Sequence, residues 1–193
     1  MEQLRFIDFI RIYRQLPKEG FNTLLNQTKY RYIYILPVLL GLFLGFNDVL
    51  NKYYLNSSDI NAGLIATSII KEIIITMIFC YFYSWIVQTL NNLFQGVSSQ
   101  SLIFAVLSYI LVPVIFVSIL ISILKIILFS VFGLQEYYRF ISIFLYLLYL
   151  GFYIVSIVLL VIGNSIASKL TIIKSIIASS IFPIFITIYD LIF

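Results

Sequence analysis

The chain has 193 residues, of which 62% are hydrophobic and 10% charged, and its mean hydropathy is +1.09. Soluble domains have about half apolar and a quarter charged residues, so the composition excludes a water-soluble protein and predicts an all-α, polytopic membrane helical bundle. The formal net charge of +4 does not indicate nucleic acid, because the basic residues flank apolar runs or gather near the N-terminus.

Residues 1–31 form the only charge-rich segment, and we expect it to lie in the cytoplasm. The apolar residues between Phe6 and Tyr13 follow helical spacing, which fits a short interfacial helix; a loosely ordered basic tail is the alternative. Charges this dense before the first apolar run also argue against a cleaved signal peptide. The candidate lipid-contact residues, whose charge attracts anionic headgroups, are Arg5, Arg11, Arg14 and Lys18.

The transmembrane domain is predicted to cover residues 32–193 with about five spans, since a span needs roughly 20 apolar residues. Residues 48–59 are expected to form a polar connection, and Lys71 and Glu72 to mark the start of the second span. A short apolar piece at 126–132 either extends the third helix or lies in the interface. The expected spans are about 32–49, 73–93, 102–124, 140–162 and 172–193.

Small residues and prolines mark candidate packing and kink positions. Gly41 and Gly45 are four residues apart, which permits close helix approach either within the chain or in a dimer; the alternative is that glycine is simply common in membrane helices. Pro113 is expected to kink the third helix near the hydroxyls of Ser108 and Tyr109. Serine hydroxyls in the uncharged turn at 95–101 are expected to cap that helix. Two further positions lie in the last third of the chain, at Gly163 and Pro183, with a short basic link expected at 163–169.

The distribution of Lys and Arg predicts the orientation of the chain, because positive residues resist translocation. With the N-terminus in the cytoplasm, the inside segments hold eight of the twelve basic residues. We therefore expect a cytoplasmic N-terminus and a C-terminus on the outer face.

The residues that support most enzymatic chemistry are missing. The chain has no histidine and a single cysteine, Cys80, inside an apolar run. Its ionisable residues lie near the ends of the predicted spans, including Asp190 close to the last residue. We therefore expect no catalytic residues, no cofactor, no metal and no enzymatic activity.

Three segments carry the motifs of one known family of membrane proteins. Ser108-Tyr109-Ile110-Leu111-Val112-Pro113 is similar to a third-helix pattern of a small residue, Tyr, several apolar residues and Pro. Residues 161–169, followed by Lys174, Ala178 and Pro183, are similar to an ending in which a short basic turn leads into a last helix with an internal proline. Residues 17–21 resemble a short motif before the first span. With these segments the chain resembles the Yip1-domain family of small multi-span membrane proteins, in its compact prokaryotic form.

The resemblance implies a five-span fold more than a particular activity. Eukaryotic members are implicated in vesicle traffic, GTPase binding and membrane shaping. The long N-terminal extension of those members is not found in this sequence, so GTPase binding is not expected. We predict a non-enzymatic scaffold or accessory subunit of a bacterial inner membrane, whose partners are lipid and other membrane proteins or further copies of itself. The alternative is a small transporter or channel-like protein with proline-kinked helices along a path.

Overall fold

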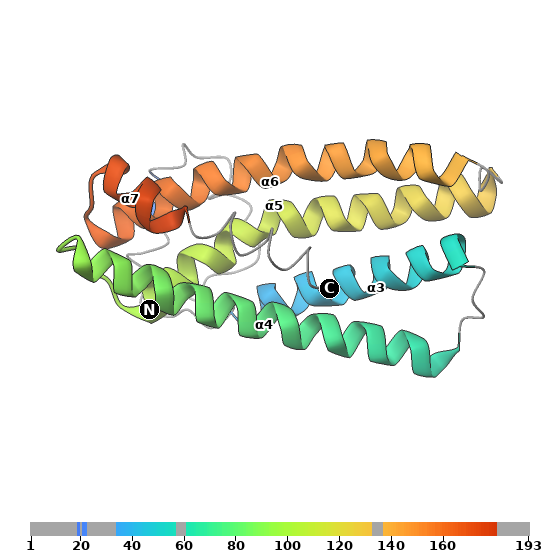
Figure 1. Ribbon diagram of the computed structural model, residues 1–193, viewed down its shortest axis with the longest axis horizontal. Helices are drawn as coiled ribbons and strands as arrows, with labels where there is room; N and C mark the ends of the chain where they lie inside the picture. The colour runs from blue at the N-terminus through green and yellow to red at the C-terminus, as the bar shows by residue number, and fades with distance from the viewer. Residues whose placement is uncertain (1–18, 20, 23–33, 57–60, 133–136, 181–193) are drawn as a thin grey trace. The chain divides into compact units, whose positions relative to one another are not determined.

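The computed structural model describes residues 19, 21–22, 34–56, 61–132 and 137–180. These residues form α3 (Ile35–Asn56), α4 (Ala62–Leu93), α5 (Gln100–Ile126), the π-helix η1 (Ile127–Val131), α6 (Tyr138–Ser168) and α7 (Ile172–Ser179), drawn in Figure 1. Within the described ranges no strand is present. The predicted all-α membrane fold is confirmed.

Four of the described helices are long and apolar enough to cross a membrane. They are the segments Ile35–Tyr54, Ala62–Leu93, Gln100–Ser130 and Phe140–Ser168. The fifth expected span, 172–193, is described only as far as Ser180, and its first part forms α7.

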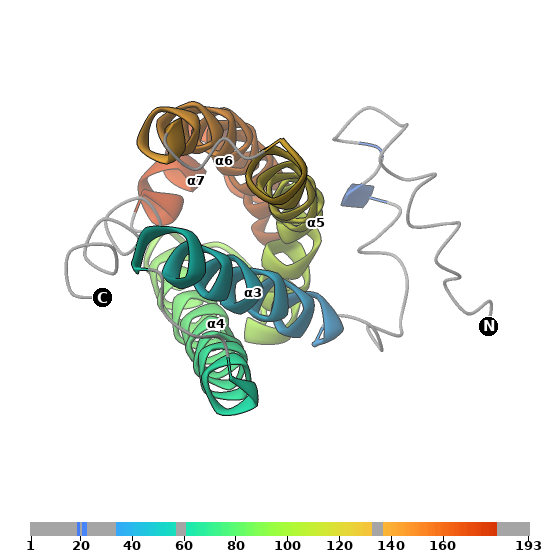
Figure 2. The same ribbon diagram turned by 90° about the vertical axis from the view of Figure 1, so that its right-hand side faces the viewer.

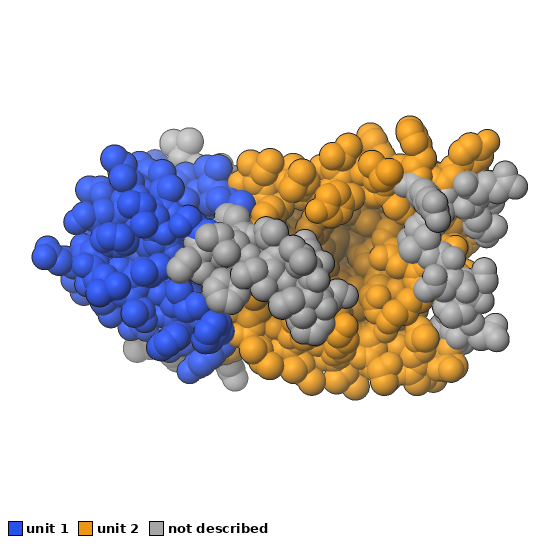
Figure 3. All heavy atoms as spheres, viewed as in Figure 1, with its two compact units in different colours: residues 1–33, 80–110, 157–193 blue, residues 34–79, 111–156 orange. Residues whose placement is uncertain are grey.

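The helices divide between two compact units, shown in different colours in Figure 3. Unit 1 comprises residues 1–33, 80–110 and 157–193, and unit 2 comprises residues 34–79 and 111–156. Inside unit 2 the helix segments follow one another in the order α4, α3, α5, α6, which Figures 1 and 2 both show. A small apolar core of Val117, Ile121 and Leu145 joins α5 to α6 there. Unit 2 is thus a row of helices in which α3 and α5 each have two neighbours.

Side-chain caps explain where two helices begin. Asn61 Oδ1 accepts a hydrogen bond from Leu64 N at 2.8 Å, and Ser99 Oγ accepts one from Leu102 N at 3.3 Å. The expected serine cap of the third helix is therefore confirmed. The Asn61 cap starts α4 at Ala62, well before Lys71 and Glu72, which were expected to mark the start of the second membrane span. Both are good helix formers and lie inside the helix.

Helix ends also differ from the expected connections. α3 continues to Asn56, so Asp48, Asn51 and Lys52 are helical and not part of a loop. The piece at 126–132 extends the third helix, since η1 follows α5 without a break. The expected link at 163–169 is mostly helical, because α6 continues to Ser168.

The C-terminal ends of α4 and α6 share one kind of turn. Gln95 and Lys169, the first or second residues beyond these helices, have φ of 64° and 54°. Gly96 N then bonds back to Asn91 O at 2.8 Å, and Leu170 N to Ser165 O at 3.1 Å. Neither left-handed residue is a glycine. The end of α4 at Leu93 nevertheless agrees with the predicted end of the second span, whereas α6 continues beyond the predicted end of the fourth span at residue 162.

Candidate functional site

Gly41 and Gly45 lie where α3 packs against α4 in unit 2. A Cβ atom on Gly41 would come within 2.5 Å of Ile73 Cα, and one on Gly45 within 2.6 Å of Ile69 Cα. The obstacle in each case is helix backbone, which cannot turn aside. The two glycines therefore allow a close approach of two helices within the chain, which is one of the two interpretations that their spacing left open.

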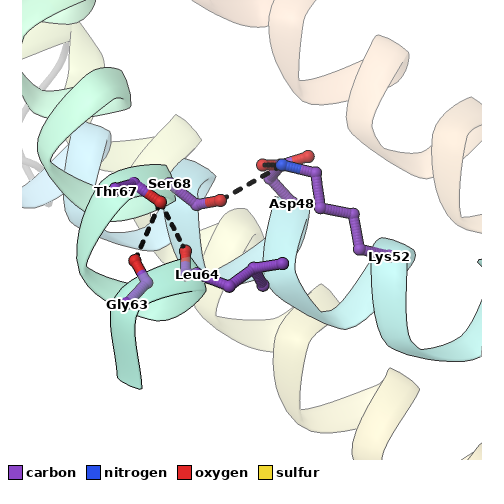
Figure 4. Close-up of polar contacts among 6 residues, drawn as sticks. All are labelled: Asp48, Lys52, Gly63, Leu64, Thr67 and Ser68. Atoms are coloured by element: carbon purple, nitrogen blue, oxygen red, sulfur yellow. Dashed lines mark hydrogen bonds and ion pairs between the residues drawn. The ribbon is translucent and has the colours of Figure 1, made fainter. Parts of the chain in front are cut away.

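Lys52, which forms an ion pair within α3, also links this helix to α4. Lys52 Nζ lies 2.6 Å from Asp48 Oδ2 and donates a hydrogen bond to Ser68 Oγ at 3.2 Å (Figure 4). The Thr67 hydroxyl, one residue before Ser68, bonds instead to carbonyl oxygens of its own helix. The last turns of α3 are thus tied to the first turns of α4.

A polar seam runs along the contact between α3 and α5. Asn47 Nδ2 lies 2.9 Å from Ser122 Oγ and 3.2 Å from Ser118 O. Lys125 Nζ donates to Asn51 Oδ1 at 2.7 Å. Farther along, the hydroxyls of Tyr54 and Ser130 share a hydrogen bond. We call this set the α3–α5 polar seam: Asn47, Asn51, Tyr54, Ser118, Ser122, Lys125 and Ser130.

Unit 1 contains a second buried polar group, the amide–serine cluster of Asn91, Ser98, Asn164, Ser168 and Ser179. Asn91 Nδ2 lies 2.7 Å from both Asn164 Oδ1 and Ser168 Oγ. Asn164 Nδ2 returns a bond to Asn91 Oδ1 at 3.2 Å and lies 3.3 Å from Ser179 Oγ. Asn91, Asn164 and Ser168 are fully buried. The paired amides therefore link α4, α6 and α7 in a region shielded from solvent.

The turns that follow α4 and α6 are joined next to this cluster. Val97 N donates to Ser168 O at 3.0 Å, and Lys174 Nζ to Phe94 O at 3.3 Å. Ser165 Oγ closes its own turn on Leu170 O at 2.7 Å. The α4–α5 turn and the α6–α7 turn consequently form one joined surface of unit 1.

Phe21, which precedes the first span, packs against residues of α5 and α6. Its side chain is 1% exposed and packs edge-on against Tyr109, with 5.6 Å between ring centroids. A Cβ atom on Gly163 would come within 2.7 Å of the Phe21 ring and 2.6 Å of Val106 Cγ1. Gly163 thus leaves room in α6 for the phenylalanine.

The other residues singled out in the sequence are buried or lie beyond the described ranges. Ser108 and Tyr109 are buried in α5, and Ser108 Oγ makes no hydrogen bond to any described residue. Pro113 lies inside α5, where it removes one backbone hydrogen bond. Outside the described residues lie Arg5, Arg11, Arg14, Lys18 and Pro183.

The hydrogen bonds of the α3–α5 polar seam and the amide–serine cluster hold neighbouring helices together. In the described part of the chain no three His, Cys, Asp or Glu side chains meet to form a metal site. The buried amides and hydroxyls of the two clusters bond mainly to one another. Such groups are suited to fixing helix positions, because neutral amides and unactivated hydroxyls are weak nucleophiles and weak bases.

Sequence reasoning missed the residues that organise both clusters. Asn47, Asn91, Asn164 and Lys125 were not among the residues predicted to pack or bind. One sequence signal could have indicated them, because an asparagine inside an apolar helix needs a hydrogen-bonding partner on a neighbouring helix.

A family model for the Yip1 domain matches residues 14–193. The chain belongs to the Yip1 domain family. This match confirms the resemblance that the third-helix and C-terminal segments indicated. It also agrees with the multi-pass arrangement of apolar helices. No curated protein and no solved structure matches the chain significantly. Membrane proteins of the Yip1 family are not known as enzymes.

Proposed function

We propose that this Yip1-domain protein is a non-enzymatic scaffold or accessory subunit of a bacterial inner membrane, and that α4 packs against a partner membrane protein or a second copy. The observation that carries the proposal is a mismatch between burial and hydropathy. In their most apolar windows α4 and α6 are equally exposed, each 17% buried, but α4 is the less apolar of the two, with a mean hydropathy of 1.9 against 2.6. A helix that is exposed and yet less apolar than its equally exposed neighbour is the better candidate for contact with protein.

The exposed side of α4 has the composition of a protein interface. Large side chains cover it, among them Ile74, Ile78 and Trp85, which are 52%, 64% and 50% exposed. Thr89 shares the exposed surface of the helix. Aromatic residues are enriched at interfaces, while a polar residue facing lipid is disfavoured. A partner covering α4 accounts for both kinds of residue.

Photo-cross-linking in intact membranes tests the proposal. A photoreactive amino acid in place of Ile78 is expected to give an adduct of one discrete protein mass, either twice that of the chain or that of the chain plus one partner.

The transporter alternative receives less support from the contacts. In the α3–α5 polar seam, Asn47 directs its amide donor to Ser118 and Ser122 of the neighbouring helix. In the amide–serine cluster, the two asparagines bond to each other. Polar groups used in this way hold helices together and are less suited to passing a solute.

We also propose that the N-terminus is cytoplasmic and the C-terminus lies on the outer face. The positive-inside distribution supports this orientation. The bond between Val97 N and Ser168 O supports one of its requirements, because the α4–α5 and α6–α7 turns must then lie on the same side. A reporter fused to the C-terminus that fluoresces only in the cytoplasm is expected to stay dark in cells, and a bright signal would refute this topology.

A further inference from the structure

Lys125 is a buried cation near the end of α5. Its side chain is 7% exposed, although lysine is almost never buried without a partner. The ammonium donates to Asn51 Oδ1 at 2.7 Å, and that amide oxygen is neutral. An ammonium has three donors, so one such bond leaves both its charge and part of its hydrogen-bonding capacity uncompensated.

The carboxylates among the described residues do not neutralise Lys125. Asp48 pairs with Lys52, which also donates a hydrogen bond to Ser68. Within the described part of the chain Lys125 has no carboxylate within ion-pair distance. Burying an ammonium next to neutral groups alone is costly, so an anionic group is expected to complete the environment of Lys125.

The neighbouring contacts place Lys125 in the part of unit 2 where a membrane headgroup is expected. Asn51 is adjacent in sequence to Lys52, which reaches Ser68 on α4. Ser68 precedes the exposed Lys71 by three residues, or about 4.5 Å along a helix. Charged residues of this kind mark the membrane interface, and Lys125 lies one residue before the end of α5.

We propose that Lys125 binds a phosphate group, with Asn51 holding the ammonium in place at the end of the α3–α5 polar seam. The ammonium supplies a charged hydrogen bond to a phosphate oxygen. The same chemistry fits the phosphodiester of an anionic phospholipid and free inorganic phosphate, and the experiment separates the two.

Thermal unfolding of the full chain in nanodiscs tests the site. Discs of phosphatidylcholine alone are compared with discs that also contain phosphatidylglycerol, each with and without inorganic phosphate. The melting temperature of the native protein is expected to be higher in discs with phosphatidylglycerol, because a ligand stabilises the state that binds it. Lys125→Gln is expected to lose this gain and to bind phosphatidylglycerol at least tenfold more weakly. Without the anionic lipid it should melt no lower than the native protein, since a buried charge has been removed.

Lys71→Gln is the matched control, because it removes an exposed lysine of the same unit. It should keep the full gain from phosphatidylglycerol. If inorganic phosphate alone raises the melting temperature of the native protein but not of Lys125→Gln, the bound group is free phosphate. Equal gains for native protein and Lys125→Gln in every condition would overturn the proposal, as expected if a carboxylate beyond the described residues already neutralises the lysine.

Discussion

Adding a single methyl group at Gly41 or Gly45 is expected to destabilise the protein by about 3 kcal/mol, at the upper end of overpacking effects. The new Cβ atom of Gly41→Ala would lie 2.5 Å from Ile73 Cα and 2.8 Å from Glu72 O. Since these are backbone atoms, α3 and α4 must separate to admit it, and their other contacts weaken. The loss of stability is measured by heating the protein in a mild detergent and recording the fraction that stays monodisperse.

Gly151→Ala in α6 is the control for this substitution. A Cβ atom there meets nothing within 4 Å. Because alanine favours a helix over glycine by about 1 kcal/mol, this variant should be as stable as the native protein or slightly more so. Equal stability of Gly41→Ala and Gly151→Ala would show that α3 and α4 do not make this close contact.

The second large effect is expected at the amide–serine cluster, where Asn91→Leu should lower the free energy of unfolding by about 3 kcal/mol. The substitution removes the bonds from Asn91 Nδ2 to Asn164 Oδ1 and Ser168 Oγ. It leaves buried polar groups of Asn164 with fewer partners and an apolar side chain beside them. Reversible unfolding with increasing denaturant in mixed micelles gives the free-energy difference.

A double-mutant cycle distinguishes a lost pair from a general packing defect. Asn91→Leu combined with Asn164→Leu should cost less than the two single changes added together, because neither amide is then left facing an apolar partner. Asn92→Leu, at the exposed neighbouring position, should change stability by less than about 0.5 kcal/mol. Strict additivity of the two cluster variants would contradict the paired arrangement.

The existence of the helices follows from the sequence, while their ends depend on local detail. Long apolar runs can only be satisfied as helices in a bilayer, which made the four described spans predictable. Lys71 and Glu72 looked like a boundary because they are charged, but charge does not end a helix. The boundary lies at Asn61, whose side chain supplies an acceptor for the first turn.

The polar clusters were harder to predict, since they depend on which helices are neighbours. Asn91 and Asn164 are 73 positions apart, and nothing local marks them as a pair. The spacing of Gly41 and Gly45 indicated a close helix contact without specifying the neighbour.

The proposed role is tested most directly by comparing cross-links from two faces of the protein in intact membranes. A photoreactive amino acid is placed at Ile74 on α4, which is 52% exposed, or at Ile154 on α6, which is 55% exposed. A protein that acts by packing through α4 predicts a discrete protein adduct from Ile74 and mainly lipid adducts from Ile154. Lipid adducts alone from both positions, with the chain recovered at its own mass, would contradict the proposal that α4 is covered by a partner.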